Sequence, residues 1–298
     1  MTTSLTKTWP PQGGMPKIIR LVIALAILLF ALVMFAHLPD QLILFPSTQP
    51  LNPHGATRKE LPFEQGKLEI WVAQSQQARL NGAADTYVLR FYGNADRAEH
   101  WAAAEAEMWN DRAVEIWAMN YPGFGGSTGP ARLSRIGPAA LAAFDELKRH
   151  AADRPIVSFG ASIGATAALH VAAQRPVAGL ILHNPVPLRE MMLRRFGWWN
   201  LWLLAGPIAW QIPRELDSIA NARASRAPAI FMLAQRDEIV PPRYHKLVVD
   251  AYAGEKRVIA LRGAFHNDPI EGAALADFHQ ALDWLLPRTI GDSSQRAE

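Results

Sequence analysis

The amino-acid sequence predicts an α/β protein in which a mostly parallel β-sheet carries helices on both faces. Short apolar runs rich in β-branched residues alternate with longer amphipathic or alanine-rich runs along most of the chain. Half of the 298 residues are hydrophobic and 19% are charged, which supplies a substantial core. Such alternation is typical of parallel sheets, because neighbouring parallel strands are joined by crossover helices.

The N-terminal segment is the clearest departure from this pattern. Residues 18–38 are apolar except for Arg20 and His37. As one helix they would be ~32 Å long, about the thickness of the hydrocarbon core of a bilayer, so they predict a transmembrane anchor. A cleaved signal peptide is disfavoured, because Met34 and Ala36 make a poor cleavage site. A buried helix of a globular domain is the third alternative.

The charges around this segment predict its orientation. Lys7, Lys17 and Arg20 come before or at the start of the apolar run, and the next Lys or Arg is Arg58. The positive-inside rule then places residues 1–17 in the cytoplasm and the rest of the chain on the non-cytoplasmic side, which is the periplasm in a bacterium. The membrane is therefore an expected partner, through this N-terminal helix.

The remaining chain divides into three parts. Residues 39–57 contain four prolines and predict an extended connector, residues 58–286 form the α/β domain, and residues 287–298 form a tail. Within the domain the predicted strands are 67–74, 86–92, 113–119, 155–159, 178–183, 228–234 and 257–262, and the predicted helices are 98–109, 137–151, 163–174 and 271–286.

A serine lies between the strand at 155–159 and the helix at 163–174, in the pentad Gly160-Ala161-Ser162-Ile163-Gly164. A serine at a sharp strand-to-helix turn is typical of a nucleophile elbow, which strains the serine backbone and crowds the positions two residues to either side. Glycine suits both of these positions. The pentad alone occurs by chance in many chains, but its context favours Ser162 as a nucleophile.

Two further reactive residues follow later strands. Asp237 comes three residues after the strand at 228–234, and His266 comes four residues after the strand at 257–262. The carboxyl ends of parallel strands meet at one edge of the sheet, where ligands bind. A serine hydroxyl is a weak nucleophile at neutral pH, so His266 would take its proton while Asp237 orients the imidazole.

The turn after the strand at 86–92 supplies a candidate oxyanion hole. Gly93 lets the chain turn there, and the backbone amide of Asn94 could then join that of Ile163 in binding a developing oxyanion.

Four nearby residues have alternative roles. His183 follows a strand and is the main rival to His266 as the base, whereas His245 is expected to be solvated on a helix. Glu238 is the rival acid. Asp268 is expected to cap the last helix.

The motifs together resemble small serine hydrolases of the α/β-hydrolase superfamily that carry an N-terminal membrane anchor. The matching stretches are "FPSTQP", "YGNA", "NYPGFGGSTG", "GASIGA", "LDSIANARASRAPAIFMLAQRDEIVPP" and "GAFHNDP", which span most of residues 39–286 in the expected order. The resemblance implies the α/β-hydrolase fold, a Ser162–His266–Asp237 triad and no cofactor. Two positions depart from the family pattern: Tyr92 replaces a histidine, and Asn120-Tyr121-Pro122 replaces Asp-Tyr-Arg. Both departures concern the fit of the substrate.

Residues 186–226 lie between two predicted core strands, where this fold carries a helical lid. The segment contains four tryptophans, Trp198, Trp199, Trp202 and Trp210. They have three compatible interpretations. They pack the lid onto the core, they form a wall for an acyl chain, or they enter a membrane surface where Arg189, Arg194 and Arg195 meet lipid headgroups. Tyr92, Trp198 and Trp202 are the candidate substrate-binding residues.

The sequence therefore predicts a serine hydrolase that cleaves esters or thioesters of lipid-like acyl groups through an acyl-enzyme. A serine peptidase of the same fold and a catalytically silent interaction domain are the alternatives. The absence of cysteine excludes thiol nucleophiles and cysteine-ligated zinc. A net charge of +3 without a long basic block argues against nucleic acid as a partner.

Overall fold

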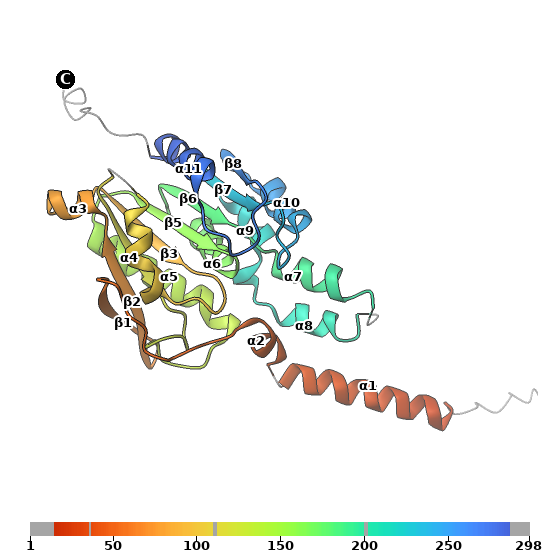
Figure 1. The fold of residues 1–298 in the computed structure, drawn as a ribbon. Helices are drawn as coiled ribbons and strands as arrows, with labels where there is room; N and C mark the ends of the chain where they lie inside the picture. The colour runs from red at the N-terminus through yellow and green to blue at the C-terminus, as the bar shows by residue number, and fades with distance from the viewer. Residues whose placement is uncertain (1–14, 36, 110–111, 200–201, 287–298) are drawn as a thin grey trace, which may run out of the picture.

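The computed structural model describes residues 15–35, 37–109, 112–199 and 202–286. Figure 1 shows a twisted central sheet with helices on both sides, as the sequence predicted. Eight strands form one sheet in the order β1-β2-β4-β3-β5-β6-β7-β8. They are β1 (Thr57–Phe63), β2 (Gly66–Gln74), β3 (Thr86–Phe91), β4 (Val114–Met119), β5 (Ile156–Ala161), β6 (Gly179–His183), β7 (Ala229–Ala234) and β8 (Lys256–Leu261).

The sheet is parallel from β4 through β8, whereas β1 and β2 form an antiparallel edge. Consecutive residues of a strand point to opposite faces of the sheet. Because helices cover both faces, the side chains on both faces are apolar. Helices α5 (Leu133–Ala151), α6 (Ile163–Gln174) and α10 (Pro242–Ala251) cover the face that includes Leu89. Helices α4 (Ala98–Glu107) and α11 (Gly272–Leu285) cover the face that includes Val88.

The predicted insert lies between β6 and β7. It contains α7 (Leu188–Met191), a π-helical turn η1 (Met192–Phe196), α8 (Ala205–Gln211), a short 3-10 turn η2 (Arg214–Leu216) and α9 (Ser218–Ala224). In Figure 1 the part with α7 and α8 extends away from the sheet toward the N-terminal helix α1 (Lys17–Phe35).

The membrane span predicted over residues 18–38 is not supported. Helix α1 ends at Phe35, His37 has a left-handed backbone, and a second helix, α2 (Leu38–Ile43), begins directly afterwards. The 19 residues of α1 are ~28 Å long, slightly less than the ~30 Å core of a bilayer. No helix within the described ranges is both long enough and apolar enough to cross a membrane.

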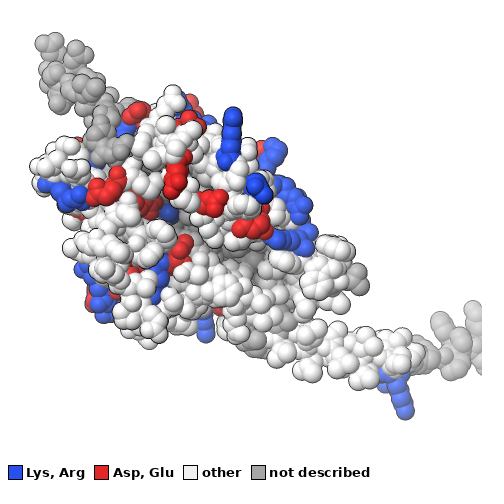
Figure 2. All heavy atoms as spheres, viewed as in Figure 1, with Lys and Arg blue, Asp and Glu red and all other residues white. Residues whose placement is uncertain are grey.

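Helix α1 nevertheless exposes apolar side chains. Ile18, Leu21 and Leu28 are each more than half exposed, and α1 contacts α8 of the insert. Figure 2 shows α1 as a largely white rod, whereas acidic and basic side chains gather over the sheet domain.

Three elements were absent from the sequence prediction. β1 is an edge strand with charged residues and Pro62, which such a position tolerates because one side of the strand makes no ladder bonds. The other two are α3 (Gln76–Asn81) and α2, which are short helices of six residues each. Helix α5 begins at Leu133, four residues before its predicted start, and Pro138 lies inside the helix.

The turn between β5 and α6 is packed too tightly for side chains at its two glycines. A Cβ atom on Gly160 would lie 2.2 Å from the carbonyl oxygen of Gly164, and one on Gly164 would lie 2.2 Å from the carbonyl oxygen of Phe91. Both glycines therefore allow α6 to approach β3 and β5 closely.

We expect Gly164→Ala to lower the free energy of unfolding by about 2 kcal/mol or more, because backbone atoms cannot yield to the new methyl group. Thermal unfolding should report a loss of ~4–8 °C. Gly206→Ala is the matched control, since a Cβ there meets nothing within 4 Å. Equal melting temperatures for the two variants would show that the turn is not tightly packed.

Candidate active site

Ser162 occupies the turn between β5 and α6. Its backbone has φ 53° and ψ −120°, a conformation that a residue with a side chain rarely adopts. Its amide donates a hydrogen bond of 2.8 Å to the carbonyl of His183, which ties the turn to β6. The strained serine expected from the pentad is thus present.

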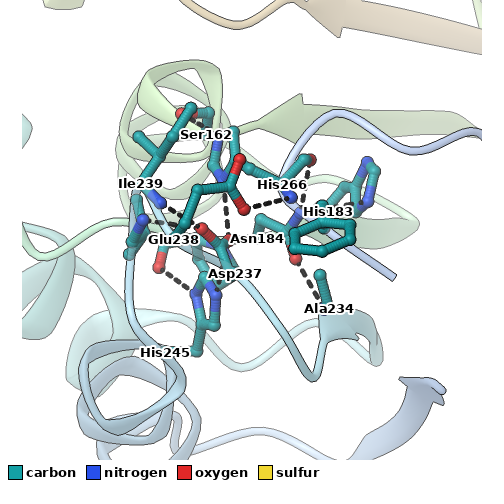
Figure 3. Close-up of polar contacts among 12 residues, drawn as sticks. Ser162, His183, Asn184, Ala234, Asp237, Glu238, Ile239, His245 and His266 are labelled. Carbon is teal, nitrogen blue, oxygen red and sulfur yellow. Dashed lines mark hydrogen bonds and ion pairs between the residues drawn. The ribbon is translucent and has the colours of Figure 1, made fainter. Parts of the chain in front are cut away.

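The structure brings Ser162, His266 and Asp237 together (Figure 3). His266 Nε2 lies 3.0 Å from Ser162 Oγ, and His266 Nδ1 lies 2.6 Å from Asp237 Oδ2. The three residues follow β5, β8 and β7, so the parallel sheet delivers them to one edge. The imidazole can accept the serine proton at one nitrogen while the carboxylate binds the other.

Asp237 is buried and has four hydrogen-bond contacts. Its Oδ1 accepts from the amides of Ile239 at 3.0 Å and Val240 at 2.7 Å. Its Oδ2 accepts from His266 and lies 3.0 Å from His245 Nε2. Burial alone would raise the pKa of Asp237, but the bonds from His245, His266 and Val240 hold that pKa well below its usual range. The carboxyl is therefore ionised.

Two side chains fix the backbone of His266. Asn184 Nδ2 donates to the His266 carbonyl at 2.9 Å, and Asn184 Oδ1 accepts from the amide of Ala234 at 2.8 Å. The carboxylate of Glu238 accepts from the His266 amide at 3.3 Å. Glu238, the rival acid, therefore contacts the backbone of His266. Asn184 was missed, although its position directly after β6 at the carboxyl edge could have signalled it.

The other rival groups have different roles. His183 makes a contact of 3.3 Å with Asn184 Nδ2, and burial together with the nearby Arg90 guanidinium lowers the pKa of His183 to about 3. It is therefore neutral. Asp268 accepts from the amide of Phe265 at 2.8 Å and closes the loop that carries His266, whereas Glu271 precedes the last helix.

The expectation of a solvated His245 is wrong. This residue lies on α10 with no exposed side-chain surface, and it contacts the carboxylate of Asp237. Sequence spacing gave no signal of this contact, because burial of one helical histidine depends on how α10 packs against the sheet.

The predicted oxyanion turn lies beside the nucleophile. A Cβ on Gly93 would be 3.6 Å from Ser162 Cβ, so the end of β3 runs along the serine. The side chain of Asn94 accepts a bond of 3.0 Å from the amide of Phe45 and donates to the carbonyl of Ile43. The oxyanion role of the Asn94 and Ile163 amides stays a prediction.

Tyr92 is placed in the core, which does not support its predicted contact with substrate. Only 5% of its surface is exposed. Its hydroxyl donates to Glu105 at 2.6 Å, and Arg90 stacks on its ring while also binding Glu105. The tyrosine that replaces the family's histidine is thus part of a buried polar network.

The tryptophans of the insert face outward. Trp198 is 68% exposed and Trp202 is 51% exposed, and Trp199 and Trp210 are also exposed. The structure therefore disfavours the interpretation that they pack the lid onto the core. Trp202 is held by a bond of 3.1 Å from its Nε1 to the carbonyl of Leu193.

Two arginines of the insert, Arg189 and Arg195, bind protein carbonyls. Arg189 donates to Ile212 at 2.7 Å. Arg195, in η1, donates to Ile239 at 2.6 Å and to Glu238 at 3.3 Å. The contacts of Arg195 join the insert directly to the loop that carries Asp237. In the part of the chain that is described, no group of His, Asp and Glu side chains has an arrangement that could hold a metal ion.

Several known proteins are similar to this chain. A family model described as the alpha/beta hydrolase fold matches residues 88–222. An uncharacterised protein of Mycobacterium tuberculosis is 29% identical over 203 residues, which cover 66% of this chain and 69% of that protein. Protein bem46 of Schizosaccharomyces pombe is 24% identical over 291 residues, which cover 89% of this chain and 93% of the yeast protein.

Solved structures are similar over most of the chain. Est1E from Butyrivibrio proteoclasticus has a TM-score of 0.60 at 15% identity, covering 76% of this chain and 98% of Est1E. The Pyrococcus furiosus esterase Pf2001 has a TM-score of 0.58 at 15% identity, covering 84% of this chain and 98% of the esterase. Identities this low show similarity of fold alone. The chain thus has the α/β-hydrolase fold, with a serine, a histidine and an aspartate in contact at the carboxyl edge of its sheet.

Proposed function

We propose that this protein is a serine hydrolase that cleaves carboxylic esters or thioesters through an acyl-enzyme. The observation that carries the proposal is the unbroken series of contacts from Ser162 Oγ through both nitrogens of His266 to Asp237. Two similar structures, Est1E and Pf2001, resemble it in fold, and Pf2001 is described as an esterase. Est1E is also known with ferulic acid bound.

The reaction follows from the positions of the three groups. His266 Nε2 removes the proton of Ser162 Oγ as the oxygen attacks the carbonyl carbon, and the resulting imidazolium is stabilised by Asp237. The negative charge on the carbonyl oxygen is bound by the amides of Asn94 and Ile163. His266 then gives its proton to the leaving alcohol or thiol. Water, deprotonated by His266, releases the acid and restores Ser162.

The substrate class is proposed from the insert. The insert has four tryptophans exposed at its surface, and Arg195 joins the insert to the loop after Asp237. An acyl chain that leaves the serine along this surface would bury its methylenes against the indole rings. We therefore propose esters of medium to long acyl chains as substrates.

Association with a membrane and a non-cytoplasmic location stay proposals. They are supported by the charge pattern around residues 18–38 and by the exposed apolar side chains of α1.

We expect Ser162→Ala to lose labelling by a fluorophosphonate probe and to lower kcat for p-nitrophenyl butyrate at least about a thousandfold, because no other hydroxyl occupies the elbow. The melting temperature of the variant should stay close to that of the wild type. Persistent labelling of the variant would show that a different residue is the nucleophile. Labelling of the wild type without turnover of any ester would favour the peptidase alternative, and a lack of labelling would favour the silent domain.

The acyl preference can be measured with acetyl, butyryl, octanoyl and palmitoyl esters. Each buried methylene contributes about 0.8 kcal/mol, so four more carbons should raise kcat/KM roughly a hundredfold. Trp198→Ala and Trp202→Ala should reduce this gain, whereas Leu80→Ala should not, because Leu80 is an exposed apolar residue on α3, outside the insert. If kcat/KM falls steadily with chain length and the tryptophan variants keep that profile, the insert has no role in acyl binding.

A further inference from the structure

We propose that His245 is a second, positively charged partner of the catalytic aspartate, and that this charge extends the activity of His266 as a base to lower pH. His245 does not touch the reacting atoms. It is a positioning residue that acts through Asp237. The inference rests on the proposed function for its effect on rate, but its structural basis is independent of the substrate.

The ring of His245 lies between two acceptors. Its Nδ1 is 3.0 Å from the carbonyl oxygen of Pro185, and its Nε2 is 3.0 Å from Asp237 Oδ2. The side chain has no exposed surface, so solvent is not in contact with either nitrogen. Figure 3 shows His245 and His266 reaching the same carboxylate from different segments of the chain.

Both neighbours of the ring can only accept hydrogen bonds. A peptide carbonyl has no proton, and the carboxylate of Asp237 is ionised because two backbone amides and His266 already donate to it. A neutral imidazole carries a single N–H, which would leave one nitrogen lone pair facing an oxygen lone pair. In a buried site such a mismatch is costly. Two N–H groups, and therefore the imidazolium form of His245, satisfy both contacts.

The surroundings of His245 are compatible with one positive charge. Asp237 faces it with a negative charge, and His266 lies on the other side of the shared oxygen. His183, at the end of β6, also interacts electrostatically with His245, but His183 is neutral. Arg223, the charged residue of the neighbouring helix α9, is exposed. The pair of His245 and Asp237 is thus a compensated buried ion pair.

This charge has a consequence for the mechanism. A lone aspartate favours the protonated imidazolium of the neighbouring His266 before substrate arrives, and a protonated His266 cannot accept the proton of Ser162. A positive charge on the far side of Asp237 weakens that attraction through Coulomb repulsion. His266 therefore stays unprotonated, and able to act as a base, at a lower pH than in a triad without the second histidine.

The test compares the pH dependence of kcat/KM for p-nitrophenyl butyrate in the wild type and in His245→Gln. Glutamine keeps an uncharged N–H near the position of Nε2, so it preserves the contact with Asp237 and removes the charge. We expect the midpoint of the acidic limb to move up by about one pH unit. His150→Gln is the matched control, since His150 lies on α5 and contacts Glu115. A midpoint of His245→Gln that stays at the wild-type value would overturn the proposal, whether or not the variant loses thermal stability.

A second measurement uses the wild-type protein alone, so it requires neither turnover of an ester nor a variant that folds. Nuclear magnetic resonance of wild-type protein with 15N-labelled histidine, assigned through bonds from the His245 backbone, should detect protons on both ring nitrogens at about pH 7. A single N–H would overturn the proposal. If no ester is hydrolysed, the proposed function fails, but the proton count of His245 still decides whether the charged partner exists.

Discussion

The carboxylate of Asp237 connects the elements on which the site depends. It accepts hydrogen bonds from two amides of its own loop, from His266 after β8, and on the proposed charge state from His245 on α10. Removing one partner of a buried ion pair lowers the free energy of unfolding by about 3–5 kcal/mol. Each donor to Asp237 therefore helps to hold the carboxylate, and with it the other donors, in position. The position of His266 relative to Ser162 is therefore set by a network that extends well beyond three residues.

The insert is coupled to this network. Arg195 binds the carbonyls of Glu238 and Ile239, so η1 is bonded directly to the loop that carries Asp237. The exposed tryptophans lie in the same insert, and α1 contacts its helix α8. On the proposed function, a lipid-like substrate that contacts these tryptophans would contact an insert that is bonded to the loop carrying Asp237. The outward orientation of Trp198 is what links the proposed substrate class to the structure.

The sheet and the placement of Ser162, Asp237 and His266 could be predicted from the sequence. Each of these residues follows a strand that is recognisable from its own short apolar run. The role of His245 could not be predicted, since its burial depends on the packing of α10 over the sheet. The end of the first helix was also missed: apolar composition continues through residue 38, but the left-handed backbone at His37 separates α1 from α2. Helix boundaries of this kind depend on backbone conformation more than on hydropathy.

The central claim is that Ser162 carries the acyl group during turnover. The most direct measurement is rapid acid quenching of the protein with a slowly deacylated p-nitrophenyl ester, followed by mass spectrometry of its peptides. We expect one added acyl group on the peptide that contains Ser162, formed at the rate of the initial burst of p-nitrophenol. An acyl group on any other residue, or a burst without acylation of the protein, would contradict it.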